Sequence, residues 1–335
     1  MKIVSIIGTR PQYIKVKPIY DYCLSQNIHH TIIDTNQHYS NNVSRNIIQS
    51  LNINIDVNLG AKGENEIEFI TDTLNKLQNV LLSMDNIFVL IYGDTNSAFA
   101  AALTCYKNNI KFAHVEAGAR CFNSKIPEEI NRIFIDTIAD INFCTAKRDC
   151  KNISNGILCG DLEYELLKSF NNNNLKDYSK YGLMTVHRQS NMNKISIQKI
   201  FTFCSDLGKI LLPIHHRLKS QKWFNTLKIP DNIKIIDPLD YNEIYQVMKS
   251  CKFILTDSGG ILKTSPFFGK KTLILRSQVG WIDTIEKEYA KICDFSLENK
   301  KWILDDSKNT DINFYSQKEK TSEIIIKTII NKNDK

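Results

Sequence analysis

Short apolar runs alternate with stretches of helical periodicity along almost the whole chain. Runs such as Ile3–Ile7 and Ile87–Tyr92 are rich in β-branched residues and apolar on both faces, as strands buried in a parallel sheet are. Because such strands alternate with helices in both halves, the pattern predicts an α/β protein with two doubly wound, Rossmann-like domains. The other predicted strands are His30–Asp34, Lys111–Val115, Ile141–Thr145, Ile157–Cys159, Leu183–Val186, Lys209–Ile214, Ile233–Ile236, Phe253–Thr256 and Thr272–Leu275.

Two predicted helices have apolar residues at helical spacing. One covers Glu66–Met84, and the other begins at Pro127. Apolar spacing of this kind indicates a face that packs on a core. The residues expected to be buried are Ile67, Ile70, Leu74, Leu77 and Leu81 in the first helix, and Ile130, Ile133, Phe134 and Ile138 in the second.

A run of four asparagines, Asn171–Asn174, marks the expected domain boundary. It lies in a polar segment that extends to Lys180, and such a composition is typical of linkers. We predict an N-terminal domain over residues 1–170 and a C-terminal domain over residues 178–316. A last amphipathic helix over residues 317–333 is expected to pack back on the first domain.

Open parallel sheets bind ligands beyond the carboxyl ends of their strands. Two such domains that face each other would place these ends along one shared cleft. The polar residues that directly follow each strand are therefore the candidates for chemistry.

The composition narrows the choice of compartment and partner. None of the runs in the 335 residues approaches the ~18–20 apolar residues that cross a bilayer, and the chain starts without a signal-like segment, so we expect a cytoplasmic protein without a membrane partner. Nine cysteines without metal-type spacing indicate reduced thiols and no metal site. The net charge of +7 is scattered, which suits a small acidic ligand better than nucleic acid.

The turn Ser258-Gly259-Gly260 follows the strand Phe253–Thr256 and precedes a helical stretch. Glycines allow a ligand to approach the backbone closely, and the free N–H groups of a helix start favour negative charge. The turn is therefore a candidate phosphate cradle. A tight strand-to-helix turn without a ligand is the alternative.

Charged residues follow several of the other strands. Arg10 and Lys15 lie near the start of a helix, where the helix dipole disfavours cations, so either they face an anion or they are solvated surface charges. Asp94 is a candidate acid or an ordinary N-cap. Glu116 interrupts an apolar strand end and needs a partner or a function. Glu128 opens a helix with Glu129, and helix-dipole complementation accounts for one of the two.

Two histidines stand at strand ends in the second half. His187 precedes Arg188, and His215 lies two residues before Arg217. Either they have a structural role, which is common for histidine, or they contribute to anion binding and acid–base chemistry.

Taken together, these motifs resemble the non-hydrolysing UDP-N-acetylglucosamine 2-epimerases, within them the subgroup that acts on UDP-2,3-diacetamido sugars. The resemblance covers about residues 1–290, and the motifs occur in the order of the family. They are Gly8–Lys15, Gln37-His38, Gly93–Ser97, His114–Gly118, Pro127–Arg132, His187-Arg188 and Thr256–Gly260.

The resemblance implies a fold like that of the GT-B glycosyltransferases, a homodimer, and no metal or nicotinamide cofactor. It implies a UDP-sugar substrate whose C2 is inverted by elimination of UDP to a 2-acetamidoglucal and re-addition, for surface polysaccharide synthesis. The implied catalytic residues are Asp94, Glu116, Glu128 and His187. The implied substrate- and nucleotide-binding residues are Arg10, Lys15, Gln37, His38, Arg132, His215, Ser258, Gly259, Gly260 and Arg276.

Four residues, at three places in the chain, differ from the family pattern. Thr264 stands where the family has a glutamate that holds the ribose, Val279-Gly280 replaces a Thr-Glu pair, and Ser190 replaces a glutamate. The expected carboxylates are intact, whereas nucleotide and outer sugar contacts differ. A non-catalytic nucleotide-sugar-binding relative is therefore an alternative to an epimerase. A GT-B glycosyltransferase, which would share the two-domain plan, is another.

Overall fold

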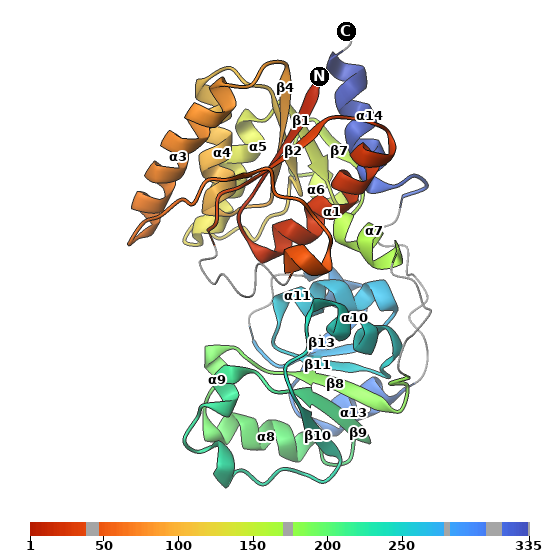
Figure 1. Ribbon diagram of the computed structural model, residues 1–335. Coiled ribbons are helices and arrows are strands. Elements are labelled where there is room, and N and C mark those ends of the chain that lie inside the picture. The colour runs from red at the N-terminus through yellow and green to blue at the C-terminus, as the bar shows by residue number, and fades with distance from the viewer. Residues whose placement is uncertain (38–46, 170–176, 278–281, 306–316, 334–335) are drawn as a thin grey trace. The chain divides into compact units, whose positions relative to one another are not determined.

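The computed structural model describes residues 1–37, 47–169, 177–277, 282–305 and 317–333 (Figure 1). The chain divides into two compact units. Unit 1 consists of Met1–Phe170 and Tyr315–Lys335, and unit 2 consists of Asn171–Phe314.

Unit 1 contains a parallel sheet of seven strands in the order β3-β2-β1-β4-β5-β6-β7. This order reverses at β1, as in doubly wound sheets. The strands are β1 Lys2–Ile7, β2 His30–Asp34, β3 Val57–Asn58, β4 Ile87–Tyr92, β5 Phe112–Val115, β6 Ile141–Cys144 and β7 Gly156–Leu158. The helices are α1 Arg10–Ser25, α3 Glu66–Leu82, α4 Asn96–Lys107, α5 Pro127–Ile138, α6 Lys147–Cys150, α7 Leu162–Ser169 and α14 Thr321–Asn333.

Unit 2 contains a parallel sheet of six strands in the order β10-β9-β8-β11-β12-β13. The strands are β8 Tyr181–Thr185, β9 Lys209–Pro213, β10 Ile233–Ile236, β11 Ile254–Thr256, β12 Thr272–Ile274 and β13 Ala290–Ile292. The α-helices are α8 Lys194–Cys204, α9 His216–Lys219, α10 Tyr241–Ser250, α11 Gly259–Thr264, α12 Ile282–Glu286 and α13 Leu297–Leu304, and the 3₁₀ helices are η1 Gln189–Asn191, η2 Phe224–Thr226 and η3 Ser265–Phe268.

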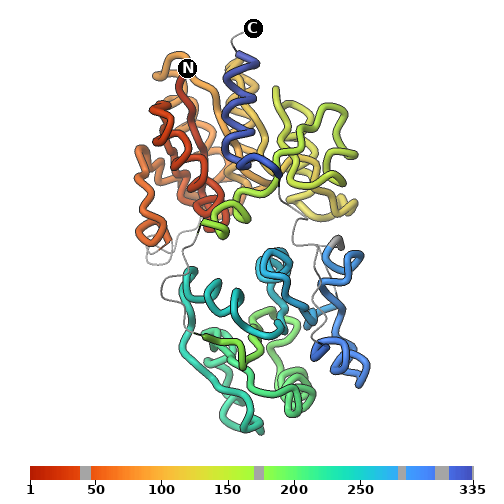
Figure 2. The backbone as a smooth tube through the Cα atoms, turned by 90° about the vertical axis from the view of Figure 1, so that its right-hand side faces the viewer, coloured from red at the N-terminus to blue at the C-terminus, as the bar shows by residue number. Residues whose placement is uncertain are grey.

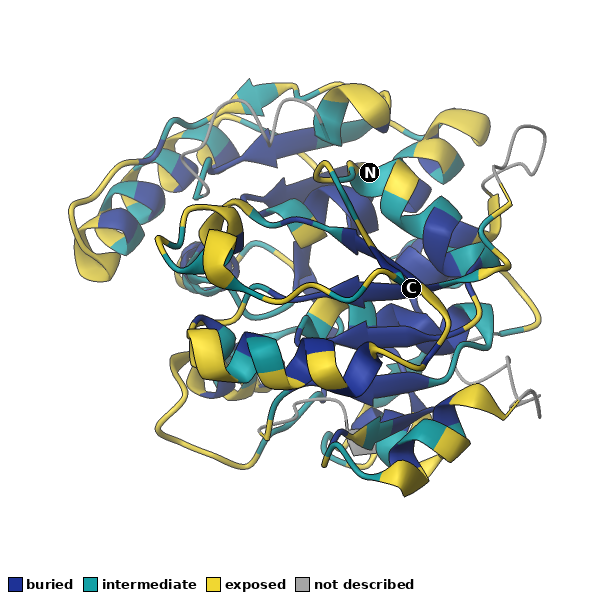
Figure 3. Ribbon diagram, turned by 90° about the horizontal axis from the view of Figure 1, so that it is seen from below, coloured by how far each residue is buried: buried dark blue, intermediate teal, exposed yellow. Residues whose placement is uncertain are grey.

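The prediction of two doubly wound α/β sheets is confirmed. Each predicted strand is present, and its boundaries differ from the predicted ones by at most two residues. The pattern did not reveal β3 and β13, because two and three residues are too few to show a period. In Figure 3 the strands are largely buried, whereas exposed positions cover the outer sides of the helices.

The C-terminal helix α14 packs on α1 and α7 of unit 1 (Figure 2). Its start is fixed by Glu165 on α7, whose carboxylate accepts hydrogen bonds from the Ser322 backbone N–H (2.8 Å) and hydroxyl (2.6 Å). The last segment of the chain therefore completes unit 1. None of the helices in the described residues combines the length and the hydrophobicity of a membrane-spanning segment.

The predicted core face of α5 is confirmed for two of its four residues. Phe134 and Ile138 pack, partly buried, against the core of unit 1, and the other two do not. Ile130 and Ile133 are 47% and 43% exposed. The buried positions of this helix are mostly polar, because their side chains form hydrogen bonds and ion pairs with residues at neighbouring strand ends. They are Glu129, Asn131, Ile135 and Asp136.

The predicted face of α3 is partly wrong. Leu77 and Leu81 are buried as expected, but Ile67 is 72% exposed. Phe69 and Thr73 complete the buried face. The buried face is therefore turned about the helix axis relative to the predicted one.

His30 forms part of a polar network inside the sheet of unit 1. Its Nε2 atom lies 2.8 Å from the Ser5 hydroxyl, which lies 2.8 Å from the Tyr92 hydroxyl. Burial, with a smaller contribution from His29, lowers the pKa of His30 from 6.5 to about 4.

We predict that this histidine makes unit 1 sensitive to acid. Between about pH 6.5 and pH 4 the unfolded chain binds a proton on His30 and the folded chain does not, so the free energy of unfolding falls as the pH is lowered. A shift of this size corresponds to roughly 3 kcal/mol. Urea unfolding at pH 7 and at pH 4.5 should show a smaller loss for His30→Gln than for the wild type. His29→Gln, at an exposed neighbouring position, is the control, and equal losses in all three proteins would contradict the prediction.

Candidate active site

The loop after β1 is fixed by Gln12. Its side-chain oxygen accepts hydrogen bonds from the backbone N–H groups of Gly8 (2.8 Å) and Thr9 (3.0 Å), which forms the N-terminal cap of α1. Its amide nitrogen donates to the Tyr92 carbonyl (2.7 Å) at the end of β4. One side chain therefore joins the loops after two adjacent strands.

Gly8 is required by the space around it. A Cβ atom at this position would lie 2.0 Å from the Thr35 hydroxyl oxygen and 2.5 Å from the Ser97 hydroxyl oxygen. These two hydroxyls are 2.6 Å apart. The glycine thus lets three strand-end loops meet.

Glu116 follows β5 and forms an ion pair with Lys15 on α1. Its backbone has φ +70°, in the left-handed region that costs a non-glycine residue about 1–2 kcal/mol. Gly93, which follows β4, is next to this pair, since a Cβ there would lie 3.6 Å from Glu116 Oε2 and 4.0 Å from Lys15 Nζ. The strained backbone and the lysine together fix the direction of the Glu116 carboxylate.

Asp94 is held by α5 and is not the N-cap of α4. The cap is Thr95, whose hydroxyl oxygen accepts from the Ala98 N–H (3.2 Å). The Asp94 carboxylate pairs with Arg132, and the Asp94 carbonyl accepts a hydrogen bond from the Asn131 amide (2.9 Å). The alternative in which Asp94 only caps a helix is therefore wrong.

The two glutamates at the start of α5 have different environments. Glu129 is 2% exposed and accepts hydrogen bonds from the backbone N–H groups of Cys121 and Phe122 (3.0 Å each) and from Arg132 (3.0 Å). Burial raises its pKa, but these hydrogen bonds outweigh burial and the pKa is lowered. Glu128 is exposed and, among the described residues, has no hydrogen-bond or ion-pair partner. Glu129 is thus the structural member of the pair, and Glu128 is available for chemistry.

The remaining predicted residues of unit 1 lie on neighbouring loops. Gln37 accepts from the Ser97 N–H (3.0 Å) and hydroxyl (2.7 Å) at the start of α4. Arg10 is the first residue of α1 and is partly exposed. His38 lies outside the described residues.

Unit 2 contains a buried carboxylate, Asp257, that sequence reasoning did not assign. It is fully buried and accepts hydrogen bonds from the backbone N–H groups of His187 (3.0 Å) and Arg188 (2.9 Å) and from the Asn191 amide (2.9 Å). The loop after β8 is therefore built around Asp257 at the end of β11. The sequence contained a sign of this role, because an acidic residue that directly follows an apolar strand needs a hydrogen-bonding partner.

Cations gather beside the glycine turn. A Cβ on Gly259 would lie 3.5 Å from an Nη atom of Arg276 and 3.7 Å from one of Arg188. The Arg276 Nε atom is buried and has no hydrogen-bond partner among the described residues, which leaves a donor to be satisfied. Ser258 caps α11 weakly, with 3.5 Å between its hydroxyl and the Ile261 N–H. Gly260 follows in the same turn, which combines backbone N–H groups with guanidinium groups.

His187 and His215 lie next to each other, with ring centroids 5.4 Å apart. Burial lowers the pKa of His187, and the Asp257 carboxylate raises it. The cations Arg188, Arg217 and Arg276 lower it further, so the pKa lies below its ordinary value. The pKa of His215 is lowered to about 4 by burial and then by His216 and His187. Positive charge therefore dominates this loop cluster, which suits an anionic ligand.

Two of the residues that differ from the family pattern, Thr264 and Ser190, lie in the helices α11 and η1. The Thr264 hydroxyl is buried and donates to the Gly260 carbonyl (3.0 Å) within its own helix. Ser190 is exposed in η1. Val279, Gly280 and the asparagines Asn171–Asn174 lie outside the described residues.

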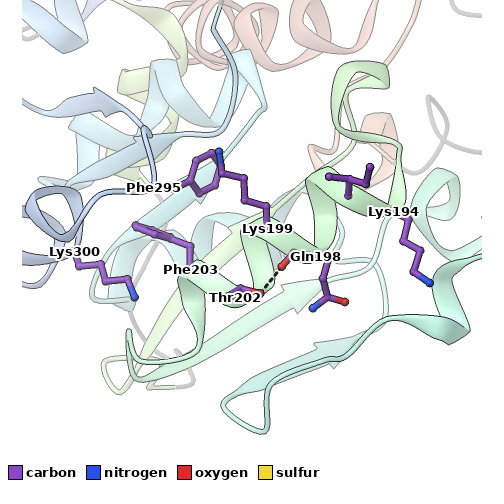
Figure 4. A pocket seen from close by; sticks show the side chains of 8 residues that line it. Lys194, Gln198, Lys199, Thr202, Phe203, Phe295 and Lys300 are labelled. Carbon is purple, nitrogen blue, oxygen red and sulfur yellow. Dashed lines mark hydrogen bonds between the residues drawn. The ribbon is translucent and has the colours of Figure 1, made fainter.

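A separate hollow on α8 includes none of the predicted site residues (Figure 4). It contains Phe203 and Phe295, packed edge to face at 5.5 Å. Lys199 and Lys300 lie over these rings, 4.2 Å from the Phe295 centroid and 5.2 Å from the Phe203 centroid. The lysines are thus engaged in cation–π contacts, and we assign this hollow no role in the site.

Comparison with known proteins identifies the relatives of this chain. A family model described as UDP-N-acetylglucosamine 2-epimerase matches residues 23–324. A UDP-N-acetylglucosamine 2-epimerase homolog of Methanococcus maripaludis is 37% identical over 313 residues, which cover 85% of this chain and 86% of the relative. The UDP-2,3-diacetamido-2,3-dideoxy-D-glucuronate 2-epimerase of Pseudomonas aeruginosa is 31% identical, with the same coverage.

Solved structures give the same relationship. The Methanocaldococcus jannaschii UDP-GlcNAc 2-epimerase, in complex with UDP-GlcNAc and UDP, has a TM-score of 0.80 and 30% identity, covering 99% of this chain and 100% of that one. The glycosyltransferase SnogD of Streptomyces nogalater has a TM-score of 0.68 at 10% identity, covering 98% and 99%. The second likeness concerns the fold alone, which is of the GT-B type.

We predict that Arg276 contributes to diphosphate binding. Arg276→Gln should weaken the binding of inorganic pyrophosphate about 10- to 100-fold, as expected for the loss of a charge-assisted hydrogen bond. Isothermal titration calorimetry would measure this change. Lys222→Gln, at an exposed cation elsewhere in unit 2, is the control. Equal affinities for the wild type and Arg276→Gln would argue against an anion site at this turn.

Proposed function

The chain belongs to the UDP-N-acetylglucosamine 2-epimerase family and is a nucleotide-sugar 2-epimerase of the non-hydrolysing type, and on this premise we propose how its residues divide the reaction. The substrate is a UDP-linked 2-acetamido sugar. A carboxylate takes the C2 proton, the C1–O bond breaks, and UDP leaves with the bonding electrons. UDP then adds back to the 2-acetamidoglucal while a proton reaches C2 from the opposite face.

One observation above all supports this division: acidic groups gather at the strand ends of unit 1, and cationic groups gather at those of unit 2. We assign proton transfer and sugar contact to Asp94, Glu116 and Glu128, because Glu128 is unpaired among the described residues and the other two are held at adjacent strand ends. Abstraction of a weakly acidic C–H proton requires carboxylates in fixed positions.

We assign the leaving diphosphate to unit 2. Arg276 and the turn Ser258–Gly260 supply donors for its oxygens, and His187 assists its departure. Stabilisation of the charge that develops on a leaving group lowers the barrier to elimination. Arg10, Lys15, Gln37, His38, Arg132 and His215 complete the proposed substrate contacts.

The names of the relatives favour two substrate classes, UDP-GlcNAc and UDP-2,3-diacetamido uronates. We propose that the product supplies a surface polysaccharide and that the protein acts in the cytoplasm, where its nine free cysteines stay reduced. Thr264 provides no carboxylate for the ribose, and its hydroxyl donates within its own helix. This difference from the family favours a second candidate, a relative that binds nucleotide sugars without turning them over.

Deuterium exchange separates these candidates. We expect incubation with UDP-GlcNAc or a UDP-2,3-diacetamido sugar in D₂O to place deuterium at C2, as measured by NMR. Glu116→Gln and Glu128→Gln should each slow the exchange by roughly 100-fold or more, since general acid–base groups contribute about 10²–10⁴-fold. Glu298→Gln, an exposed glutamate in the first turn of α13, should exchange like the wild type. Binding without exchange for every sugar tested would favour the non-catalytic candidate.

We also propose that two copies of the chain associate through unit 1. Helices α3, α4 and α5 lie side by side (Figure 1), and their outer surfaces expose large apolar side chains. Contiguous apolar surface is typical of association sites, and we propose that these side chains contribute to such a surface. The exposed residues include Ile67 (72%), Tyr106 (53%), Ile130 (47%) and Ile133 (43%).

A charge on this surface should disrupt the dimer. We expect Ile133→Glu to convert a dimer into a monomer at micromolar concentration, because it introduces a charge into an apolar interface. Sedimentation velocity would measure the change in mass. Ile195→Glu, at an 82% exposed position in unit 2, should leave the dimer intact. A wild-type monomer at the same concentration would exclude this proposal.

A further inference from the structure

His114 connects the strand that carries Glu116 to the loop that carries Asp94. It lies on β5 and its side chain is fully buried. Its Nε2 atom is 2.8 Å from the Gly93 carbonyl oxygen, and since a carbonyl only accepts, Nε2 is the donor. The residue that it binds directly precedes Asp94.

Asp136 holds the other side of the His114 ring. The carboxylate of Asp136, on α5, is 2.6 Å from His114 Nδ1 and 2.6 Å from Arg120. It also accepts from the Gly118 N–H (3.2 Å), two residues after Glu116. Burial raises the pKa of Asp136, but the contacts with His114 and Arg120 outweigh burial and the pKa is lowered.

We propose that His114 and Asp136 are positioning residues that set the location of the Asp94 carboxylate through the Gly93 carbonyl. This inference rests on the proposed proton-transfer role of Asp94. Neither side chain is placed to touch substrate, because His114 is fully buried and 4% of the Asp136 side chain is exposed.

The backbone beside these residues explains why such a support is needed. Gly93, Glu116 and Gly118 all have positive φ values, of +66°, +70° and +80°. This region is unfavourable for Glu116, and glycine adopts positive and negative φ about equally well, so local preference alone does not hold the turn. The bonds from His114 and Asp136 fix the turn on each side of the two carboxylates, and small displacements of a catalytic group reduce rates strongly.

A pair of substitutions separates the two bonds of the His114 ring. In His114→Asn the amide nitrogen takes the place of Nδ1, so the contact with Asp136 is retained and the bond to Gly93 is lost. In His114→Gln the amide nitrogen takes the place of Nε2, so the bond to Gly93 is retained. We expect kcat to fall about 100-fold or more in His114→Asn with KM changed less than about threefold, and to fall less than about tenfold in His114→Gln.

The rate of C2 deuterium incorporation should follow kcat in both variants. Thermal unfolding shows whether each variant is folded, and both should be destabilised because each loses one buried hydrogen bond. Equal loss of kcat in the two variants, or a change confined to the unfolding temperature, would overturn the proposal. If the wild type shows no deuterium incorporation with any of the sugars, the proposed function fails instead.

A second pair keeps the test decisive if the His114 variants do not fold. Asp136→Asn can accept from Gly118 and Arg120 and donate to Nδ1, so the ring still donates to Gly93. Asp136→Leu has a similar size but cannot hold the ring. We expect Asp136→Asn to retain at least ten times the kcat of Asp136→Leu, measured per folded protein. Equal activities would contradict the role of Asp136.

Discussion

The helix α5 carries buried charges, and the organisation of unit 1 depends on how these charges are satisfied. A buried charge without a partner costs several kcal/mol, so each must find a hydrogen-bonding group. Glu129 accepts hydrogen bonds from backbone N–H groups that follow Gly118 in the chain. Arg132 pairs with Asp94, and Asp136 pairs with His114. Each partner lies near the end of a strand or in the loop that follows it. The need to pair the charges of one helix thus fixes the loops that carry the proposed catalytic carboxylates.

The same helix has an apolar side, and its orientation follows from the polar side. Because the charged residues of α5 face the loops, Ile130 and Ile133 must face outward. Phe134 is partly buried against Phe99 of α4, with ring centroids 4.9 Å apart, so α4 and α5 pack directly on each other. The site and the proposed dimer surface are therefore two consequences of one orientation, since a rotation of α5 that buried its isoleucines would remove the partners of Asp94 and His114.

This orientation also shows where sequence reasoning succeeded and where it failed. Strand ends could be predicted because apolar runs stop at polar residues, and the candidates Asp94, Glu116 and His187 all stand at such ends. The buried face of α5 could be predicted only in part, because a hydrophobic period shows where apolar residues lie and gives no sign that charged residues are buried. The pairing of Lys15 with Glu116 links residues 101 positions apart, and no local pattern contains it. Asp257 was visible in the sequence but its three donors were not.

The two units use opposite arrangements of charge. In unit 1 the cations Lys15 and Arg132 hold carboxylates in place, whereas in unit 2 the carboxylate Asp257 holds the backbone beside His187 and Arg188. The groups that have no partner within their own unit therefore differ in charge between the two units. Glu128 is an acidic group of unit 1 that has no partner among the described residues, and the Arg276 Nε atom is such a donor in unit 2. An elimination needs both a proton acceptor and a receptor for the negative leaving group, and each unit leaves available the kind of group that one of these two tasks requires.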